Sequence, residues 1–274
     1  MGGAIIGIPL VAGEDVVLYD TKGRRYLVKL REDGRYHSHA GIIEHADIIG
    51  MVEGSVLKTS KGMEVAVFRP TLLDRVMEMP RGAQIIYPKD LGSIVMHADI
   101  APGMKVLEAG VGSGALSMVL LRAGASVYGY ELREDFAQRA EENIKRAFGE
   151  SVDWQVTLHD VYEGIDLSGL DRILLDLPEP WHVVEHAEGA LLPGGILLSY
   201  LPSMDQVIHL RQSLEKSRFG FASTYEVLQR GWHIEDRSVR PDHRMVAHTG
   251  FITVARLLTV STGKFRSWSM SPVR

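Results

Sequence analysis

The chain has 274 residues, of which 45% are apolar, and a formal net charge of −5. This length exceeds one typical domain and predicts a large domain with a smaller one attached. The 30 basic and 35 acidic residues exclude a protein that neutralises phosphates over its whole surface, but they leave room for a local basic face. Because the chain lacks cysteine, disulfides and thiolate metal sites are excluded. No signal peptide or membrane-spanning run is visible, so we expect a soluble, cytoplasmic protein.

The first part of the chain has the pattern of a small β domain. Short β-type segments between residues 15 and 70 flank turns at 21–23 and 61–62, which predicts two hairpins. Residues 71–79 follow as a helix with Thr71 as its N-cap, ended by the Pro-Arg-Gly of residues 80–82, where we place the boundary.

The second part alternates strand-like and helix-like runs from residue 104 onward, which predicts an α/β fold with a mostly parallel, Rossmann-like sheet. Segments 221–230 and 251–258 are strand candidates with only a polar loop, 231–250, between them, so an antiparallel pair should close the sheet. We expect three parts: a small β-rich domain over 1–70, a larger domain over 71–260 in which 71–90 form a connecting helix and cleft segment, and a flexible basic tail over 261–274.

A glycine-rich turn directly follows the first strand of the larger domain. Residues 106–114 read Val-Leu-Glu-Ala-Gly-Val-Gly-Ser-Gly, and such glycines let a backbone pass close to a ligand. The spacing alone fits NAD, FAD, S-adenosylmethionine or a structural turn without a ligand. Glu108 would repel a pyrophosphate but can accept a hydrogen bond from the amino group of a methionine tail. This acid therefore favours S-adenosylmethionine over NAD.

Acidic residues also end the three strands that come next. Glu131 lies 17 residues after Gly114, close to the spacing at which an acid binds ribose hydroxyls. Asp160 follows the next strand and can accept a bond from an adenine amino group. Asp176 ends an apolar strand and enters the proline-stiffened turn Leu-Pro-Glu-Pro, which can hold its carboxylate against a flat base. The structural alternatives are helix caps for Glu131 and Asp176 and an ordinary loop acid for Asp160.

The loop at 231–250 carries the strongest local basic cluster of the chain. It is a candidate phosphate clamp, and a solvated loop balanced by nearby acids is the alternative. The histidine pairs His37/His39 and His182/His186 have the best spacing for a metal, but neither has a third ligand, so no metal site is expected.

Five stretches together resemble the tRNA (adenine-58-N1)-methyltransferases over nearly the whole chain. They are residues 81–90 (RGAQIIYPKD), 108–116 (EAGVGSGAL), 130–136 (YELREDF), 176–181 (DLPEPW) and 240–251 (RPDHRMVAHTGF). The resemblance implies a class I methyltransferase fold, S-adenosylmethionine as methyl donor, tRNA as substrate and a homotetramer. Some members of this family also modify the neighbouring adenine 57.

The same resemblance implies roles for individual residues. Asp176 matches the family's catalytic aspartate, and Tyr87 matches an aromatic position near the target base, where core packing is the alternative. The residues expected to bind the cofactor are Gln84, Glu108, Gly110, Gly112, Ser113, Gly114, Glu131, Asp160 and Val161. The residues expected to bind tRNA are Arg237, Arg240, Arg244 and His248.

These residues suggest a mechanism without a metal. The enzyme aligns adenine N1 with the activated methyl group, and the carboxylate of Asp176 stabilises the cation that develops on the base. Two other functions are alternatives: an NAD-dependent oxidoreductase, which leaves Glu108 and the Asp176 turn unexplained, and a non-catalytic tRNA-binding subunit, although every cofactor motif is intact.

Overall fold

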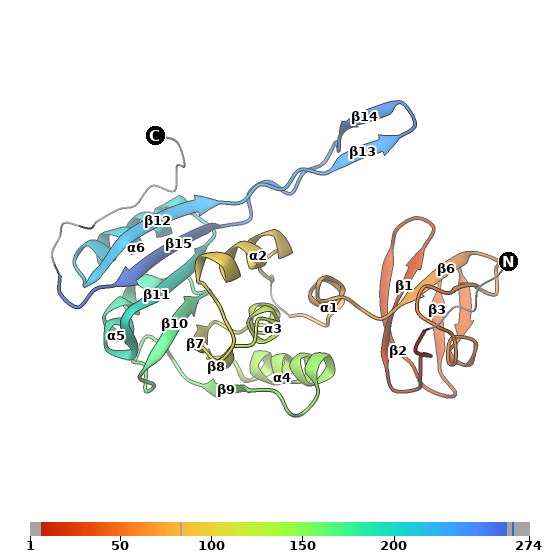
Figure 1. Cartoon of the computed structure of the whole chain (residues 1–274), viewed down its shortest axis with the longest axis horizontal. Coiled ribbons are helices and arrows are strands. Elements are labelled where there is room, and N and C mark those ends of the chain that lie inside the picture. The colour runs from red at the N-terminus through yellow and green to blue at the C-terminus, as the bar shows by residue number, and fades with distance from the viewer. Residues whose placement is uncertain (1–6, 83, 262–264, 266–274) are drawn as a thin grey trace. The chain divides into compact units, whose positions relative to one another are not determined.

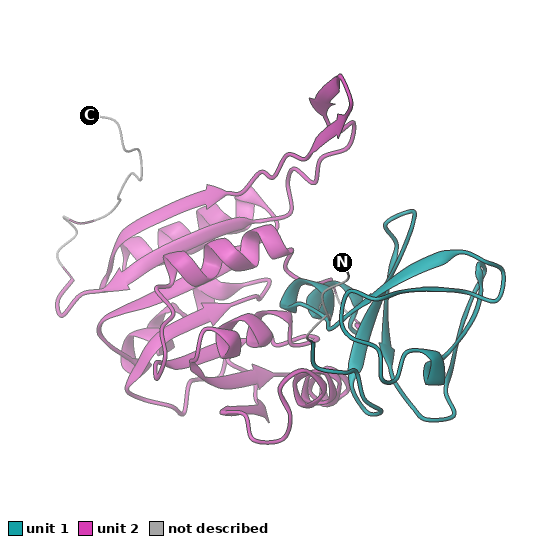
Figure 2. Cartoon of the chain, turned by 45° about the vertical axis from the view of Figure 1, so that its right-hand side comes forward, with its two compact units in different colours: residues 1–79 teal, residues 80–274 magenta. Residues whose placement is uncertain are grey.

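The computed structural model describes residues 7–82, 84–261 and 265. The chain divides into two compact units, residues 1–79 and 80–274 (Figure 2), so the helix after Thr71 groups with the first unit. Most of the predicted tail lies outside the described residues. None of the helices in the described part of the chain is long and apolar enough to cross a membrane.

Unit 1 is a small β structure (Figure 1). Its main sheet is antiparallel in the order β2-β1-β6-β5, and β3 and β4 form a separate hairpin. The β1/β2 and β5/β6 hairpins confirm the two that the sequence predicts. The helix is confirmed with Thr71 as N-cap, where Thr71 and Asp74 form a reciprocal capping box. The elements are β1 (Asp15–Asp20), β2 (Arg25–Lys29), β3 (Arg35–Ser38), β4 (Gly41–Glu44), η1 (His45–Asp47), β5 (Val56–Lys58), β6 (Glu64–Phe68) and α1 (Leu72–Glu78).

Unit 2 contains a seven-stranded sheet in the order β12-β15-β11-β10-β7-β8-β9. The five strands from β11 to β9 are parallel, and β15 pairs antiparallel with both β11 and β12, which confirms the predicted closing pair. The elements are α2 (Pro88–His97), β7 (Lys105–Ala109), α3 (Ala115–Arg122), β8 (Ser126–Glu131), α4 (Glu134–Phe148), β9 (Trp154–Leu158), β10 (Leu170–Leu175), η2 (Pro180–His182), α5 (Val184–Ala190), β11 (Leu191–Leu201), α6 (Met204–Glu215), β12 (Phe219–Glu226), β13 (Trp232–Glu235), β14 (Ser238–Pro241) and β15 (Phe251–Leu257).

The strand order places a ligand crevice at one edge of this sheet. Chain order runs outward from β7 to β9 on one side and from β10 to β11 on the other. In such sheets, ligands bind at the carboxyl ends of the strands where the order reverses, here between β7 and β10. The strands are held by a continuous apolar core that includes Leu107, Ile173 and Leu197.

Two features differ from the sequence expectation. Residues 231–250 are not simply a polar loop, because β13 and β14 form an antiparallel hairpin that projects from the sheet (Figure 1). Helix α2 was not expected at all. It begins at Pro88, which suits a first helical turn because proline lacks an N–H that this turn leaves unpaired.

Candidate active site

Four of the predicted residues lie at the carboxyl ends of four neighbouring strands. Gly110 follows β7, Glu131 ends β8, Asp160 lies two residues after β9, and Asp176 follows β10. Backbone hydrogen bonds continue past the strands, from Gly110 N to Tyr130 O (2.9 Å) and from Asp176 N to Ala109 O (3.0 Å). The sheet therefore fixes the main chain of the site up to the residues that carry the chemistry.

The glycine turn requires glycine at two positions for different reasons. Gly110 has φ +86°, and a Cβ there would lie 2.2 Å from the carbonyl oxygen of Asp176, so a side chain would push the two turns apart. Gly112 has φ +57°, and a Cβ there would meet no atom within 4 Å. The backbone of Gly112 thus borders open space, as expected of a turn that a ligand approaches closely.

Glu108 is a buried acid with one side-chain partner. Its exposed fraction is 1%, and the Ser117 hydroxyl donates a hydrogen bond to its carboxylate. Burial raises the pKa of Glu108 to about 8 against the opposing effect of the Ser117 bond, and the charges of Asp176 and Glu131 raise it further. A cation placed beside Glu108 would restore the ionised form.

Asp176 is the second acid at this edge of the sheet whose pKa is strongly raised. Burial raises the pKa of its carboxyl group to about 7, and the nearby charge of Glu131 adds to the effect. Its carboxylate forms no hydrogen bond or ion pair with another residue that the structure describes. A perturbed acid without a protein partner at a sheet switch point is a typical functional-site candidate.

Glu131 is held by main-chain donors. Its two carboxylate oxygens accept bonds from the N–H groups of Gly112 (2.9 Å), Leu132 (2.9 Å) and Arg133 (3.0 Å). The bonds from Leu132 and Arg133 shape the turn before α4. Glu131 therefore has, in part, the structural role beside this helix that the sequence left open as an alternative. The bond to Gly112 links this acid to the glycine turn.

Two cavities meet at Asp176. The inner one, of about 20 Å³, lies against Glu108 and the turn from Gly110 to Ser113. The outer one, of about 390 Å³, is lined by Tyr87, Tyr200 and His248 among others. Both cavities share four wall residues, Gln84, Ile85, Ile86 and Asp176. Asp176 therefore stands where a molecule in one cavity would face a molecule in the other.

The segment that carries Gln84 is tied to the glycine turn. Asn143 on α4 donates from Nδ2 to the carbonyl oxygens of Pro80 (2.9 Å) and Ser113 (3.0 Å), and Gly82 N lies 3.4 Å from Ser113 Oγ. Ser113 is 3% exposed, so its position serves to connect these segments. Gly114 begins α3 as its N-cap with φ +84°.

Four predicted cofactor residues, Gly114, Glu131, Asp160 and Val161, do not line either cavity. Asp160 accepts a bond from Tyr162 N (3.0 Å), and Val161 packs into the apolar core with 4% exposure. Sequence reasoning also missed wall residues of the outer cavity, such as Tyr200 from β11. Leu132, directly after Glu131, is 69% exposed.

The β13–β14 hairpin carries apolar side chains on one face and mainly polar side chains on the other. Its cross-strand pairs are Trp232 with Pro241 and Ile234 with Val239 on one face, and His233 with Arg240 and Glu235 with Ser238 on the other. Trp232, Ile234 and Val239 are 59%, 73% and 60% exposed. The predicted basic residues Arg237, in the hairpin turn, and Arg244, which follows β14, are also exposed. Neither of them nor Arg240 forms an ion pair with a described residue.

His248, the fourth residue predicted to bind tRNA, lies apart from these arginines at the wall of the outer cavity. Its Nδ1 lies 3.0 Å from Glu226 Oε2 and its Nε2 lies 2.9 Å from Pro202 O. Both partners are hydrogen-bond acceptors, and the contacts with Pro202 O and Glu226 raise the pKa of His248.

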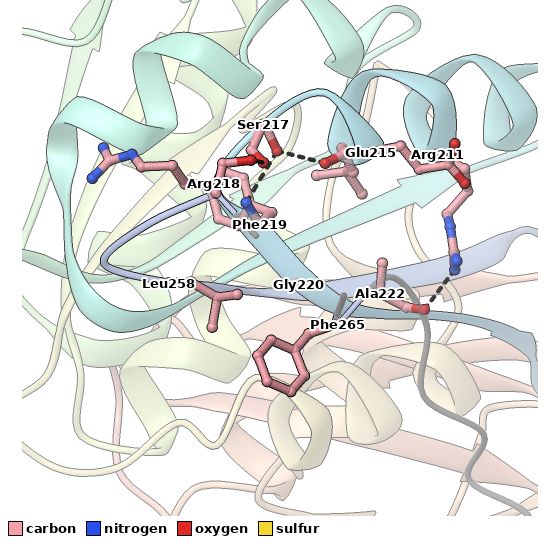
Figure 3. Close-up of a pocket in the computed structure, with 11 residues that line it drawn as sticks. Arg211, Glu215, Ser217, Arg218, Phe219, Gly220, Ala222, Leu258 and Phe265 are labelled. Carbon is pink, nitrogen blue, oxygen red and sulfur yellow. Dashed lines mark hydrogen bonds between the residues drawn. The ribbon is translucent and has the colours of Figure 1, made fainter. Parts of the chain in front are cut away.

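A further small cavity lies between the end of α6 and β12, remote from these strand ends (Figure 3). Its volume is about 20 Å³, and its two arginines already have partners: Arg211 donates to Ala222 O (2.7 Å) and Arg218 pairs with Glu188 (2.9 Å). Phe265 stacks on Phe221 at its rim, with ring centroids 5.1 Å apart. These bonds explain the cavity as packing, so it is not a candidate for the chemistry.

Of the histidines singled out by spacing, His182 and His186 have protein partners. His182 Nε2 accepts a bond from Trp181 Nε1 (3.0 Å), and His186 Nε2 lies 3.1 Å from Tyr162 O. Within the described ranges, no group of three or more His, Asp or Glu side chains is arranged to hold a metal ion.

Comparison with known proteins gives the family. The model of the tRNA methyltransferase complex GCD14 subunit matches residues 65–249, and the TrmI-like N-terminal model matches residues 9–57. The tRNA (adenine(58)-N(1))-methyltransferase TrmI of Thermus thermophilus is 38% identical over 245 residues, which are 88% of this chain and 96% of that protein. The chain belongs to the tRNA (adenine-58-N1)-methyltransferase family. The resemblance inferred from the five stretches is thereby confirmed.

Further relatives agree in sequence and fold. A protein of Methanocaldococcus jannaschii named tRNA (adenine(57)-N(1)/adenine(58)-N(1))-methyltransferase TrmI is 36% identical over 88% of this chain and 94% of its own length. The crystal structure of TrmI from Aquifex aeolicus superposes with a TM-score of 0.82 at 29% identity, covering 92% of this chain and all of that one. A SAM-dependent O-methyltransferase from Thermotoga maritima gives 0.86 at 33% identity, covering 91% and 95%. The class I methyltransferase fold is confirmed, and the chain is an enzyme of this SAM-dependent class.

Proposed function

We propose that this enzyme transfers the methyl group of S-adenosylmethionine to N1 of adenine 58 in tRNA. The observation that carries the proposal is the position of Asp176, whose carboxylate borders both the glycine-turn cavity and the outer cavity. A methyl donor whose methionine end lies against the glycine turn at the inner cavity, and a base held in the outer cavity, would meet at this residue.

The acidic residues at the inner cavity suit S-adenosylmethionine as the ligand. Glu108 and Asp176 lack a cationic partner among the described residues, and their raised pKa values favour a ligand that brings positive charge. Glu108 would accept from the amino group of the methionine end, close to the Gly112 backbone. Glu131 would accept from the ribose hydroxyls, and the exposed Leu132 offers an apolar contact for the adenine ring. Asp160 and Val161, in the turn after β9, would contact the adenine, as the family resemblance implies.

The cofactor, when bound, supplies a methyl group already activated as part of a sulfonium. The protein therefore needs mainly to align the lone pair of adenine N1 and to stabilise charge. Asp176 would accept from the exocyclic amine of the base and stabilise the positive charge that develops as the N–C bond forms. Tyr87 would stack on a base turned out of the tRNA elbow, since it lines the outer cavity.

The two faces of the β13–β14 hairpin suit two partners. On the polar face, Arg240, with the nearby Arg237 and Arg244, would bind tRNA phosphates, which fix register rather than sequence. Trp232, Ile234 and Val239 on the apolar face would be covered by another copy of this chain in a homotetramer. His248, next to Pro202, would shape the outer cavity wall beside the tRNA. A cytoplasmic location stays a prediction.

The substrate is tested with unmodified tRNA transcripts, labelled S-adenosylmethionine and mass mapping of the product. We expect one methyl group at adenine 58, and its loss when that base is replaced by guanine while adenine 57 is kept. A second methyl group at adenine 57 would extend the specificity. Methylation elsewhere in the tRNA, or none with any tRNA, would refute the proposal.

A further inference from the structure

The Lys-Asp pair of the Tyr-Pro-Lys-Asp motif, residues 87–90, has no part in the mechanism described so far. Lys89 and Asp90 lie in the first turn of α2 with side chains 4% and 0% exposed. Lys89 Nζ contacts both carboxylate oxygens of Asp90, at 2.9 and 3.1 Å. A buried ion pair is costly to form unless other groups form hydrogen bonds with it. The other groups that contact Lys89 and Asp90 therefore indicate what the pair does in the structure.

Those partners lie on the two chain segments that lead into and out of the hairpin. Lys89 Nζ donates to Val227 O (2.6 Å), just after β12, and to Thr249 Oγ1 (2.6 Å), just before β15. The Thr249 hydroxyl in turn donates to Asp90 Oδ2 (2.6 Å). All three Lys89 protons are therefore used, and the two sides of the hairpin base are held against one helix turn.

The same network reaches the walls of the outer cavity. The Tyr200 hydroxyl donates to Asp90 Oδ2 (3.2 Å), and Asp90 N donates to Tyr87 O (2.9 Å). A Cβ on Gly250 would lie 2.4 Å from the Tyr200 ring, so only glycine allows this ring to pack there. Tyr87, Tyr200 and Thr249 all line the cavity. The ion pair thus connects three of its walls.

We propose that Lys89 and Asp90 are positioning residues that set the spacing between Tyr87, Tyr200 and the hairpin base, and so align the base for methyl transfer. This inference rests on the proposed function. Neither residue lines the outer or the inner cavity, so they act through their neighbours and not on the reacting atoms. Displacement of a reacting group by about 1 Å costs on the order of 100-fold in rate. The network therefore should affect turnover and not cofactor binding.

The test uses the full-length protein with both charges removed together, as Lys89→Met/Asp90→Asn, because replacing one partner would leave a buried charge unpaired. The asparagine oxygen can still accept from Tyr200 and Thr249. Single-turnover rates are measured at saturating tRNA and S-adenosylmethionine, together with the affinity for each ligand and the thermal unfolding midpoint. We expect a loss of about 100-fold in rate, with S-adenosylmethionine affinity within about threefold of the wild type.

Arg172→Met is the matched control, because Arg172 forms a buried contact at the other end of the same helix. Its guanidinium donates to Ala98 O and pairs with Asp99 (3.0 Å), away from both cavities. We expect this variant to lower the unfolding midpoint and keep the rate. The proposal is overturned if the double variant keeps a rate within threefold of the wild type, if cofactor affinity falls as much as the rate, or if the control loses rate equally. Inactivity of the wild type on tRNA adenine would instead refute the proposed function.

Discussion

The strand-end site and the β13–β14 hairpin belong to the same unit but are built in opposite ways. At the strand ends, Glu108 and Glu131 are 1% and 7% exposed, and main-chain or hydroxyl donors hold their carboxylates. On the hairpin, Ile234 is 73% exposed, and the described contacts between its strands are those of a short two-stranded ladder. An isolated hairpin of this kind has little stability of its own.

The difference separates two tasks. Alignment of reacting atoms requires groups locked by burial and hydrogen bonds, which the strand ends supply. Recognition of a large, charged molecule and of another subunit requires reach and exposed surface, which the hairpin supplies. Substitutions at the strand ends should therefore change turnover, whereas substitutions on the hairpin should change binding and assembly.

The largest effect is expected for Asp176→Asn. The amide cannot stabilise a developing cation as the carboxylate does, so kcat should fall by about 100- to 1,000-fold while S-adenosylmethionine still binds. Asp171→Asn is the matched control, because Asp171 lies at the opposite end of β10 and accepts a bond from Lys105 N (2.9 Å). Steady-state kinetics and calorimetry measure both. Near-normal turnover of the Asp176 variant would remove this residue from the mechanism.

A smaller effect is expected from the polar face of the hairpin. Arg240→Ala/Arg244→Ala should weaken tRNA binding about tenfold and lower the slope of log affinity against log salt by about two, because two phosphate contacts are lost. Lys105→Ala/Lys216→Ala removes equal charge from exposed positions elsewhere and should change neither. Binding is measured by fluorescence anisotropy at several salt concentrations.

On the apolar face of the β13–β14 hairpin, substitutions should change assembly and not tRNA binding. Trp232→Ser/Ile234→Ser should reduce the mass of the assembly in sedimentation, whereas the arginine variant should keep it. If the serine variant leaves the mass unchanged, or if the arginine variant dissociates the assembly, then the division of the hairpin into two faces is wrong.

Much of the strand-end site could be predicted from sequence because it depends on local pattern. Apolar runs end directly at Gly110, Glu131 and Asp176, and parallel strands bring such ends together at one edge. The division into two cavities could not be predicted, since it depends on how Ile85 and Ile86 pack beside Asp176.

Helix α2 and the hairpin escaped prediction for physical reasons. In α2 the buried face includes Asp90 as well as Leu91 and Ile94, so a charged residue stands where the helical pattern expects an apolar one. In the β13–β14 hairpin, Ile234 and Val239 are exposed and do not pack on the core of unit 2. The strands therefore lack the alternation of buried apolar and exposed polar residues by which a strand is predicted. Both features depend on contacts distant in sequence.

The smallest effect tests the electrostatics of the strand ends in the free enzyme. The pKa of Glu108 is raised to about 8 by burial, against an ordinary value of 4.5. Between these values Glu108 keeps a proton in the folded protein that it has released in the unfolded chain, so its contribution to stability is greatest at low pH and falls as pH rises through this window, by at most about 1.4 kcal/mol per pH unit. Asp176, with a pKa of about 7, adds a similar slope at lower pH.

Glu108→Gln should flatten this dependence, because glutamine does not titrate, whereas Glu150→Gln at the exposed end of α4 should not. All four tryptophans lie in residues 154–268, so tryptophan fluorescence follows the unfolding of unit 2 alone. S-adenosylmethionine should stabilise the wild type more as pH rises toward 8, because its positive charge favours the ionised carboxylate. If the unfolding midpoints of wild type and Glu108→Gln run parallel from pH 5 to 8, then Glu108 is ionised in the free enzyme and cannot be the group that couples cofactor binding to proton release.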